Sequence, residues 1–147
     1  MKLFRRIAAL ALAVAVVAMF GISASAADFT RNVSGDFGVG VGAMFKGDLE
    51  LRKATAEVEF FGDETEDDDI DLEWQRVQIA CSYLDSFGDM QGEVADVTDR
   101  TRKCFSVEVT IDSPLTIASA TYRYDAYYVA NGVVECHISD GPVTLTN

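Results

Sequence analysis

The sequence predicts an all-β protein, a single antiparallel β-sandwich, and three observations support this fold class. Several segments alternate apolar and polar residues with a period of two, which is typical of strands that bury one face. Turn-forming residues separate these segments, most clearly at Asn131-Gly132. Roughly five or six such segments follow one another along the chain, an order that favours antiparallel sheets packed face to face.

The clearest element is a hairpin within residues 116–138. From Ala118 to Ala130 the even positions are alanine or tyrosine, and Asn131-Gly132 then interrupts the pattern. A two-residue loop would put the next apolar set on the polar face, whereas a three-residue loop, Ala130-Asn131-Gly132, keeps both sets on the buried face. The pairs would be Tyr128–Val134, Ala126–Cys136 and Tyr124–Ile138. We therefore predict a type I turn with Gly132 in the left-handed conformation, closing a bulge.

Two segments are compatible with both a strand and a helix. In residues 48–61, alternating Ala54, Ala56, Val58 and Phe60 favour a strand, and the strand-forming residues there decide us for it. In residues 71–85, Val77, Ile79, Cys81 and Tyr83 fit a strand, which we favour, while Trp74, Val77, Cys81 and Leu84 fit a helix face. A helix at 71–85 would make the fold α+β. Trp74, the only tryptophan, is expected in the core.

The remaining segments are expected to be less regular. The glycine-rich segment 27–47 reads as irregular chain with one edge strand near 37–41. Residues 85–103 read as a long polar loop with a short strand near 92–97. Residues 104–112 alternate and form a strand that ends at Ser113-Pro114. Residues 139–142 should turn the chain before a last edge strand at 143–145.

The first 26 residues have the pattern of a secretory signal peptide. A basic start is followed by an apolar run from Ile7 to Ile22 and by Ala24-Ser25-Ala26, an A-x-A cleavage signal. The apolar run is shorter than the roughly 20 residues that a membrane span needs. We expect cleavage after Ala26, one secreted extracellular domain at 27–147, no membrane span after cleavage, and a bacterial source.

The charge and the cysteines restrict the partners and the redox chemistry. Removal of Lys2, Arg5 and Arg6 takes the formal charge from −12 to −15, so nucleic acid is not expected as a partner. The three cysteines are an odd number for a secreted chain. Alternation turns Cys81 and Cys136 inward and Cys104 outward, so Cys81–Cys136 is the disulfide candidate, with three unpaired thiols as the alternative.

An acidic stretch at 63–73 suggests a metal site. It holds eight carboxylates, and Asp67, Asp69 and Asp71 have the spacing that opens a calcium loop. The calcium-loop pattern then fails, because Leu72 stands where it needs glycine and Gln78 where it needs glutamate. A solvated, self-repelling loop is the simpler interpretation, and calcium is the only cofactor that the sequence suggests.

Catalytic patterns are missing from the sequence. His137, the only histidine, neighbours Cys136 on a strand, so the two side chains should point to opposite faces. No nucleophile elbow of the G-x-S-x-G type occurs. We therefore do not expect an enzyme.

The hairpin resembles the last two strands of a fibronectin type III or immunoglobulin-like domain. The residues that carry the resemblance are Tyr122-Arg123-Tyr124-Asp125-Ala126, Ala130-Asn131-Gly132 and Val134-Glu135. It covers about residues 54–138 and implies an earlier strand bearing Trp74 against the hairpin, and a role in binding rather than catalysis. The expected function is an extracellular binding module for a protein or glycan, with Tyr127, Val129 and the C-terminal edge as the candidate surface. The alternatives are a calcium-binding protein that uses residues 63–73, or a small secreted enzyme or inhibitor, the latter presenting residues 85–103.

Overall fold

The described part of the chain is built from strands alone. The structure, a computed structural model, describes residues 27–35, 41–61, 70–100 and 106–147. Its eight strands are β1 (Ala27–Ser34), β2 (Gly42–Leu49), β3 (Lys53–Phe61), β4 (Ile70–Leu84), β5 (Met90–Asp99), β6 (Ser106–Asp112), β7 (Ile117–Ala130) and β8 (Val134–Thr146). Within these ranges there is no helix, and so none that could cross a membrane. The strand predictions for 48–61 and 71–85 are confirmed, and the α+β alternative is wrong.

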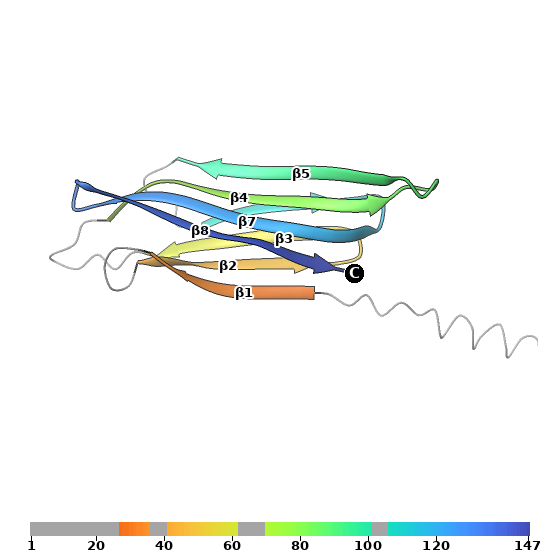
Figure 1. Cartoon of the computed structure of the whole chain (residues 1–147), viewed down its shortest axis with the longest axis horizontal. Coiled ribbons are helices and arrows are strands. Elements are labelled where there is room, and N and C mark those ends of the chain that lie inside the picture. Colours follow the sequence, from red (N-terminus) through yellow and green to blue (C-terminus); the bar gives the residue numbers. More distant parts are fainter. Residues whose placement is uncertain (1–26, 36–40, 62–69, 101–105) are drawn as a thin grey trace, which may run out of the picture.

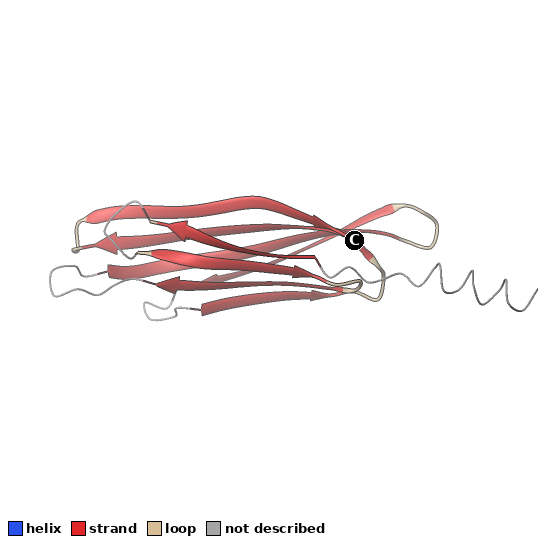
Figure 2. Cartoon of the chain, turned by 90° about the horizontal axis from the view of Figure 1, so that it is seen from below, coloured by secondary structure: helices blue, strands red, loops and turns tan. Residues whose placement is uncertain are grey.

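The strands form two antiparallel sheets of four strands each. One sheet has the order β1-β2-β3-β6 and the other the order β5-β4-β7-β8. The sheets lie as two layers along the long axis of the molecule (Figures 1 and 2). The predicted all-β sandwich architecture is thus confirmed, with more strands than expected. β1 and β6 are the edges of the first sheet, and β5 and β8 are the edges of the second.

Paired aromatic rings form the centre of the core between the sheets. Three tyrosines of β7 face three phenylalanines of the first sheet, with ring centroids 5.3 to 5.8 Å apart. The pairs are Tyr122–Phe29, Tyr124–Phe45 and Tyr128–Phe60. The three tyrosines are fully buried, as their even positions predicted. Aromatic pairs of this kind add about 0.5–1.5 kcal/mol beyond the burial of their area.

Burial changes the acidity of the core tyrosines and of Cys81. The Tyr122 hydroxyl donates a 2.7 Å hydrogen bond to the Asp48 carbonyl, and the Tyr124 hydroxyl donates one of 3.5 Å to Oε1 of buried Gln75. Burial raises the pKa of both phenols well above 10.0, with smaller contributions from nearby negative charge. Burial, assisted by Glu93, raises the pKa of the Cys81 thiol from 9.0 to about 11.

We expect these raised pKa values to make the fold sensitive to alkali. Above pH 9.0 to 10.0 the unfolded chain loses thiol and phenol protons that the folded chain still holds. The free energy of unfolding should therefore fall progressively as the pH rises from about 9 toward 11, because the unfolded state then binds fewer protons. Urea unfolding across this range, with absorbance at 295 nm to follow tyrosine ionisation, measures the effect. Ionisation of all five tyrosines near pH 10 in a protein that stays folded would contradict it.

The hairpin between β7 and β8 has the predicted faces but a different register. Ala130 pairs with Val134, Tyr128 with Cys136 and Ala126 with Ile138, two residues away from the predicted pairs. A shift of two leaves every side chain on its predicted face, so Cys136 and Ile138 are buried as expected. The loop is Asn131–Val133, in which Asn131 and Gly132 both have positive φ, 53° and 68°. Gly132 is left-handed as predicted, but two positive φ values belong to a type I′ turn rather than to type I.

The irregular N-terminal segment that we predicted is instead strand on both sides of a gap. β1 and β2 cover most of residues 27–49, and 36–40 of the expected edge strand at 37–41 lie outside the described residues. Glycine is used here for close approach, because a Cβ on Gly47 would lie against the Phe29 ring. That ring packs edge-on against Phe45, with centroids 5.0 Å apart. The glycine therefore lets the edge strand β1 contribute a ring to the core.

The long polar loop predicted at 85–103 is also wrong. β5 occupies Met90–Asp99, and a tight turn at 85–89 joins it to β4. The Asp85 carboxylate accepts hydrogen bonds from the backbone N–H groups of Phe87 and Asp89 and from the Gln91 amide. Both faces of β5 are largely exposed, and this hid its alternation in the sequence. The turn presents Phe87, whose side chain is 89% exposed.

Two bulges change which face the side chains take along a strand. In β4 the register shifts between Leu72 and Trp74, so Leu72 and Gln75 are both buried while Trp74 points away from the core. The prediction that Trp74 is a core residue is therefore wrong, because alternation from Val77 backwards crosses this bulge. In β8 a second shift lies opposite Arg123, at Gly141-Pro142. Residues 139–142 thus form a bulge within one strand instead of the predicted turn between two.

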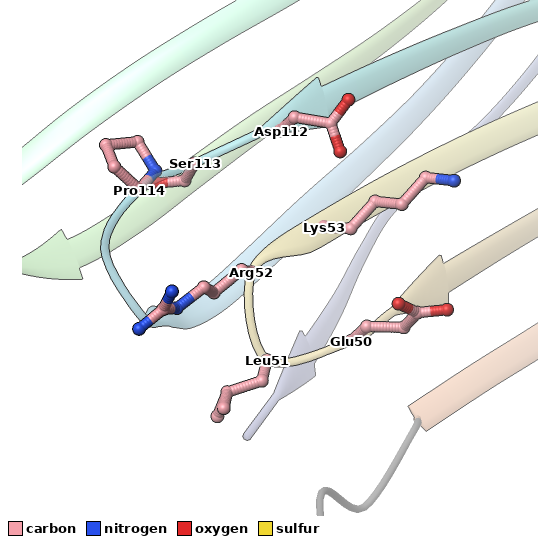
Figure 3. A pocket seen from close by; sticks show the side chains of 7 residues that line it. All are labelled: Glu50, Leu51, Arg52, Lys53, Asp112, Ser113 and Pro114. Atoms are coloured by element: carbon pink, nitrogen blue, oxygen red, sulfur yellow. The ribbon is translucent and has the colours of Figure 1, made fainter.

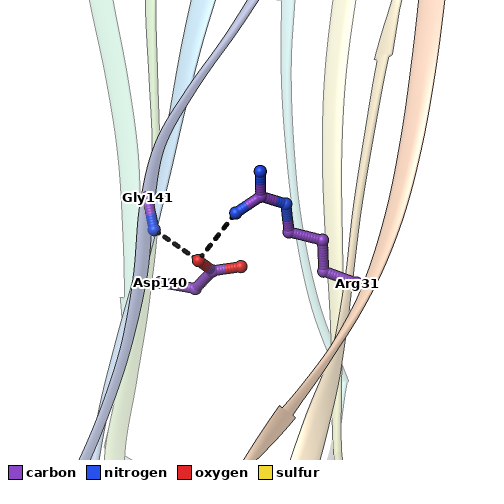
Figure 4. Close-up of polar contacts among 3 residues, drawn as sticks. All are labelled: Arg31, Asp140 and Gly141. Atoms are coloured by element: carbon purple, nitrogen blue, oxygen red, sulfur yellow. Dashed lines mark hydrogen bonds and ion pairs between the residues drawn. The ribbon is translucent and has the colours of Figure 1, made fainter.

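An ion pair joins the two sheets at one side, next to the second bulge. Arg31 of β1 reaches Asp140 of β8, with Nη1 and Oδ1 3.1 Å apart. The same oxygen accepts a 2.8 Å hydrogen bond from the Gly141 N–H (Figure 4). Half of the Arg31 side chain is exposed, so the contribution of this pair to stability is small, about 0–1 kcal/mol.

Candidate binding face

Three aromatic side chains form a row across the outer face of the second sheet. Trp74 of β4 pairs with Tyr127 of β7, which pairs with His137 of β8. The Trp74 and Tyr127 rings are stacked, with centroids 6.5 Å apart and planes inclined by 20°. The Tyr127 and His137 rings are 4.8 Å apart and tilted by 53°. We call Trp74, Tyr127 and His137 the aromatic row. Its first two members are half-buried and His137 is exposed, so the row is open to solvent.

Polar side chains border the aromatic row on both sides. On one side Arg76 lies opposite Asp125, which lies opposite Ser139. Arg76 also forms an ion pair with Asp96 of β5, at 3.0 Å. On the other side Asp71 and Glu135 flank Val129. The row is therefore a strip of ring surface between two lines of hydrogen-bonding groups.

The environment of Tyr127 keeps its hydroxyl protonated. Desolvation by its neighbours raises the pKa of this phenol, and its hydrogen bond to Glu135 acts in the same direction. The charges of Glu135 and Glu73 raise it further. Because the carboxylate accepts this bond, Tyr127 is a neutral ring with a polar tip at physiological pH. The hydroxyl is positioned by the β7–β8 hairpin rather than by a loop.

Sequence reasoning found part of this face. Tyr127 and Val129 were predicted to be exposed, and both are half-buried on the outer face. Trp74 was missed because the bulge after Leu72 is needed to turn it outward. His137 was expected on the polar face and lies there, but its neighbourhood with Tyr127 depends on the register of the hairpin. The signal available in the sequence was the odd-numbered aromatic Tyr127 among even-numbered tyrosines.

The predicted metal site falls mostly outside the described residues. Asp67 and Asp69 lie there, while Asp71 begins the outer face of β4, opposite Val129. In the described ranges, no group of three potential ligand side chains is arranged to hold a metal ion. The calcium prediction therefore has no geometry to support it here.

The predicted Cys81–Cys136 disulfide does not fit the fold. Both thiols are buried and unbonded. Cys81 lies opposite Ala120 of β7, and Cys136 lies opposite Tyr128 on the other side of the same strand. Eight residues along a strand span roughly 26 Å, far beyond the Cα separation of about 4.4–6.8 Å that a disulfide needs. Both inward orientations were right, but the pairing required the register. Cys104 lies outside the described residues.

A hollow of about 730 Å³ opens at the end of the sandwich, between the β2–β3 turn and the β6–β7 connection. It is lined by Glu50, Leu51, Arg52, Lys53, Asp112, Ser113 and Pro114. Figure 3 shows that the cationic ends of Arg52 and Lys53 point away from each other. The carbonyls of Leu51 and Arg52 accept backbone hydrogen bonds from Ile117 and Ser113, so these turns hold the two sheets together. A binding site needs polar groups that converge, and these do not.

Comparisons with known proteins give no relative for this chain. No family model, no curated protein and no solved structure matches it. The outer face must therefore be interpreted from its own geometry.

Proposed function

We propose that this protein is a secreted bacterial binding module, without catalytic activity, that holds its ligand on the outer face of the β5-β4-β7-β8 sheet. The aromatic row carries the proposal, since it places Trp74 and Tyr127 side by side on a rigid, solvent-accessible sheet. Tryptophan and tyrosine are the residue types that most often dominate binding energy. The signal-like residues 1–26 support export to the extracellular space.

Cross-strand stacking alone is the competing explanation of the aromatic row. Such pairs contribute about 0.2–1 kcal/mol to a sheet and need no ligand. The two explanations differ in what a substitution should do. A purely structural row would lose stability when truncated, whereas a binding row would lose its ligand while the core, which lies on the other face, keeps the protein folded.

The strand order supports an immunoglobulin-like sandwich of the kind that serves as a binding scaffold. If β2 to β8 are lettered in chain order as A, B, C, C′, E, F and G, the sheets become A-B-E and C′-C-F-G. Constant-type immunoglobulin domains pair A, B and E in one sheet and C, F and G in the other, and variable-type domains add C′ beside C. β1 is an addition at the edge beside β2. Trp74 departs from the pattern, because the buried tryptophan of strand C points outward here.

Retention on washed host cells tests the proposal. We expect the chain from residue 27 onward to sediment with the cells, and the double variant Trp74→Ala/Tyr127→Ala to lose retention at least about 10-fold, as expected for removal of two hot-spot rings. Phe87→Ala is the matched control, because it removes an equally exposed ring from the β4–β5 turn and should change nothing. Circular dichroism verifies that the variants are folded. Equal retention of the double variant, or no retention of the unaltered protein, would refute the binding face.

A further inference from the structure

We infer that the ligand of the aromatic row is an uncharged glycan chain that runs across the strands, an inference that rests on the proposed binding face. The row has the two properties that sugar rings require together. It offers flat ring surface for the C–H face of a pyranose, and it offers hydrogen-bonding groups at the level of the hydroxyl rim.

The ring spacing fits consecutive sugars of a chain. Adjacent strands lie about 4.8 Å apart, a distance comparable to the length of one sugar ring. The ring centroids of the row follow this spacing, at 6.5 Å between Trp74 and Tyr127 and 4.8 Å between Tyr127 and His137. Two neighbouring sugars can therefore stack on Trp74 and Tyr127, with a third reaching His137. The chain direction is then perpendicular to the strands.

The bordering groups match hydroxyls. On one side the Arg76 guanidinium provides several N–H donors and Asp125 provides acceptors. On the other side Glu135 provides acceptors, and its contact with the Tyr127 hydroxyl holds that tip at the edge of the row. Hydroxyl groups both donate and accept, so a sugar can satisfy both kinds of partner.

The same surroundings make a protein or an anionic polymer a poor ligand. The centre of a protein interface is depleted of charged residues, whereas Arg76, Asp125 and Glu135 directly border the row. An anionic polymer would meet the carboxylates of Asp71 and Glu135 and a chain with a formal charge of −12. An uncharged ligand that exchanges hydrogen bonds avoids both costs.

Fluorescence titration tests the inference, because Trp74 is the only tryptophan and reports directly on the row. The probes are cellohexaose, mannohexaose and chitohexaose, with a hyaluronan hexasaccharide as the anionic control. We expect a saturable change with at least one uncharged hexasaccharide and none with hyaluronan. Tyr127→Ala should weaken binding at least about 10-fold, while Tyr127→Phe, which keeps the ring, should stay within about threefold. Phe87→Ala should bind as the unaltered protein does.

Two outcomes separate this inference from the proposed function. Retention on cells that survives exhaustive protease digestion, together with competition by a hexasaccharide, supports the glycan. Retention that depends on the aromatic row but is abolished by digestion, with no hexasaccharide response, overturns the glycan and leaves the binding face standing. Retention that does not depend on the row overturns the binding face itself.

Discussion

Phe45→Ala is expected to lower the free energy of unfolding by about 3–5 kcal/mol, the cost of removing a buried phenylalanine from a core. The Phe45 side chain has no exposed surface and lies between Phe29 and Tyr124, with centroids 5.0 and 5.8 Å away. Its loss removes contacts from both sheets and leaves a cavity that strands held by ladders on two sides cannot close. Domains are typically stable by only about 5–15 kcal/mol, so the loss is a large part of the total. Urea unfolding followed by circular dichroism measures it.

Phe87→Ala is the control for that substitution. It deletes the same atoms from a side chain that is 89% exposed, so the expected change is within about 0.5 kcal/mol. A loss of less than about 1 kcal/mol for Phe45→Ala would mean that the core does not contain the aromatic pairs described here.

Gly141→Ala is expected to destabilise the fold by at least about 2 kcal/mol, because two costs act together. Gly141 has a φ of 106°, which side chains rarely adopt. A Cβ at this position would also lie 2.6 Å from the backbone carbonyl oxygen of Tyr122, and backbone on a central strand cannot move aside cheaply. The bulge, the neighbouring Asp140 and its ion pair with Arg31 should all be disturbed. Thermal melting compares the variant with the unaltered protein.

Two other glycines separate the two costs. Gly88 has a φ of 85° but nothing within 4 Å of an added Cβ, so Gly88→Ala should cost only the conformational strain, about 1–2 kcal/mol. Gly92 has an ordinary φ and its nearest atom is 3.8 Å away, so Gly92→Ala should be neutral or slightly stabilising. If Gly141→Ala costs no more than Gly88→Ala, the steric part of the explanation is wrong.

Alternation in the sequence was sufficient to predict strands where one face is fully buried. The even positions of β7 and β3 are apolar and lie in the core as expected. β1 and β5 were missed, because edge strands with both faces largely exposed have little alternation to show. The glycines of β2 appeared to oppose a strand, yet Gly47 is where the Phe29 ring needs space.

The binding face could not be predicted, for a reason that lies in the bulges. A bulge inserts one residue and exchanges the two faces beyond it, and Trp74 owes its outward direction to one such residue. Nothing in the local sequence around Glu73 distinguishes this insertion from continuous alternation. The aromatic row further combines residues of three strands, so it exists only once the register of two ladders is known.

The bulge at Gly141-Pro142 also determines what the outer side of β8 can do. An edge strand exposes unpaired N–H and C=O groups that can recruit another chain, and two-sheet proteins have four such edges. On β8 the bulge interrupts this row of groups, and Pro142 has no N–H to offer. On β5 three carboxylates, those of Glu93, Asp96 and Asp99, oppose a second copy of equal charge. Both edges of the sheet that carries the aromatic row are thus protected against polymerisation, which allows a secreted protein to display a sticky face and remain dispersed.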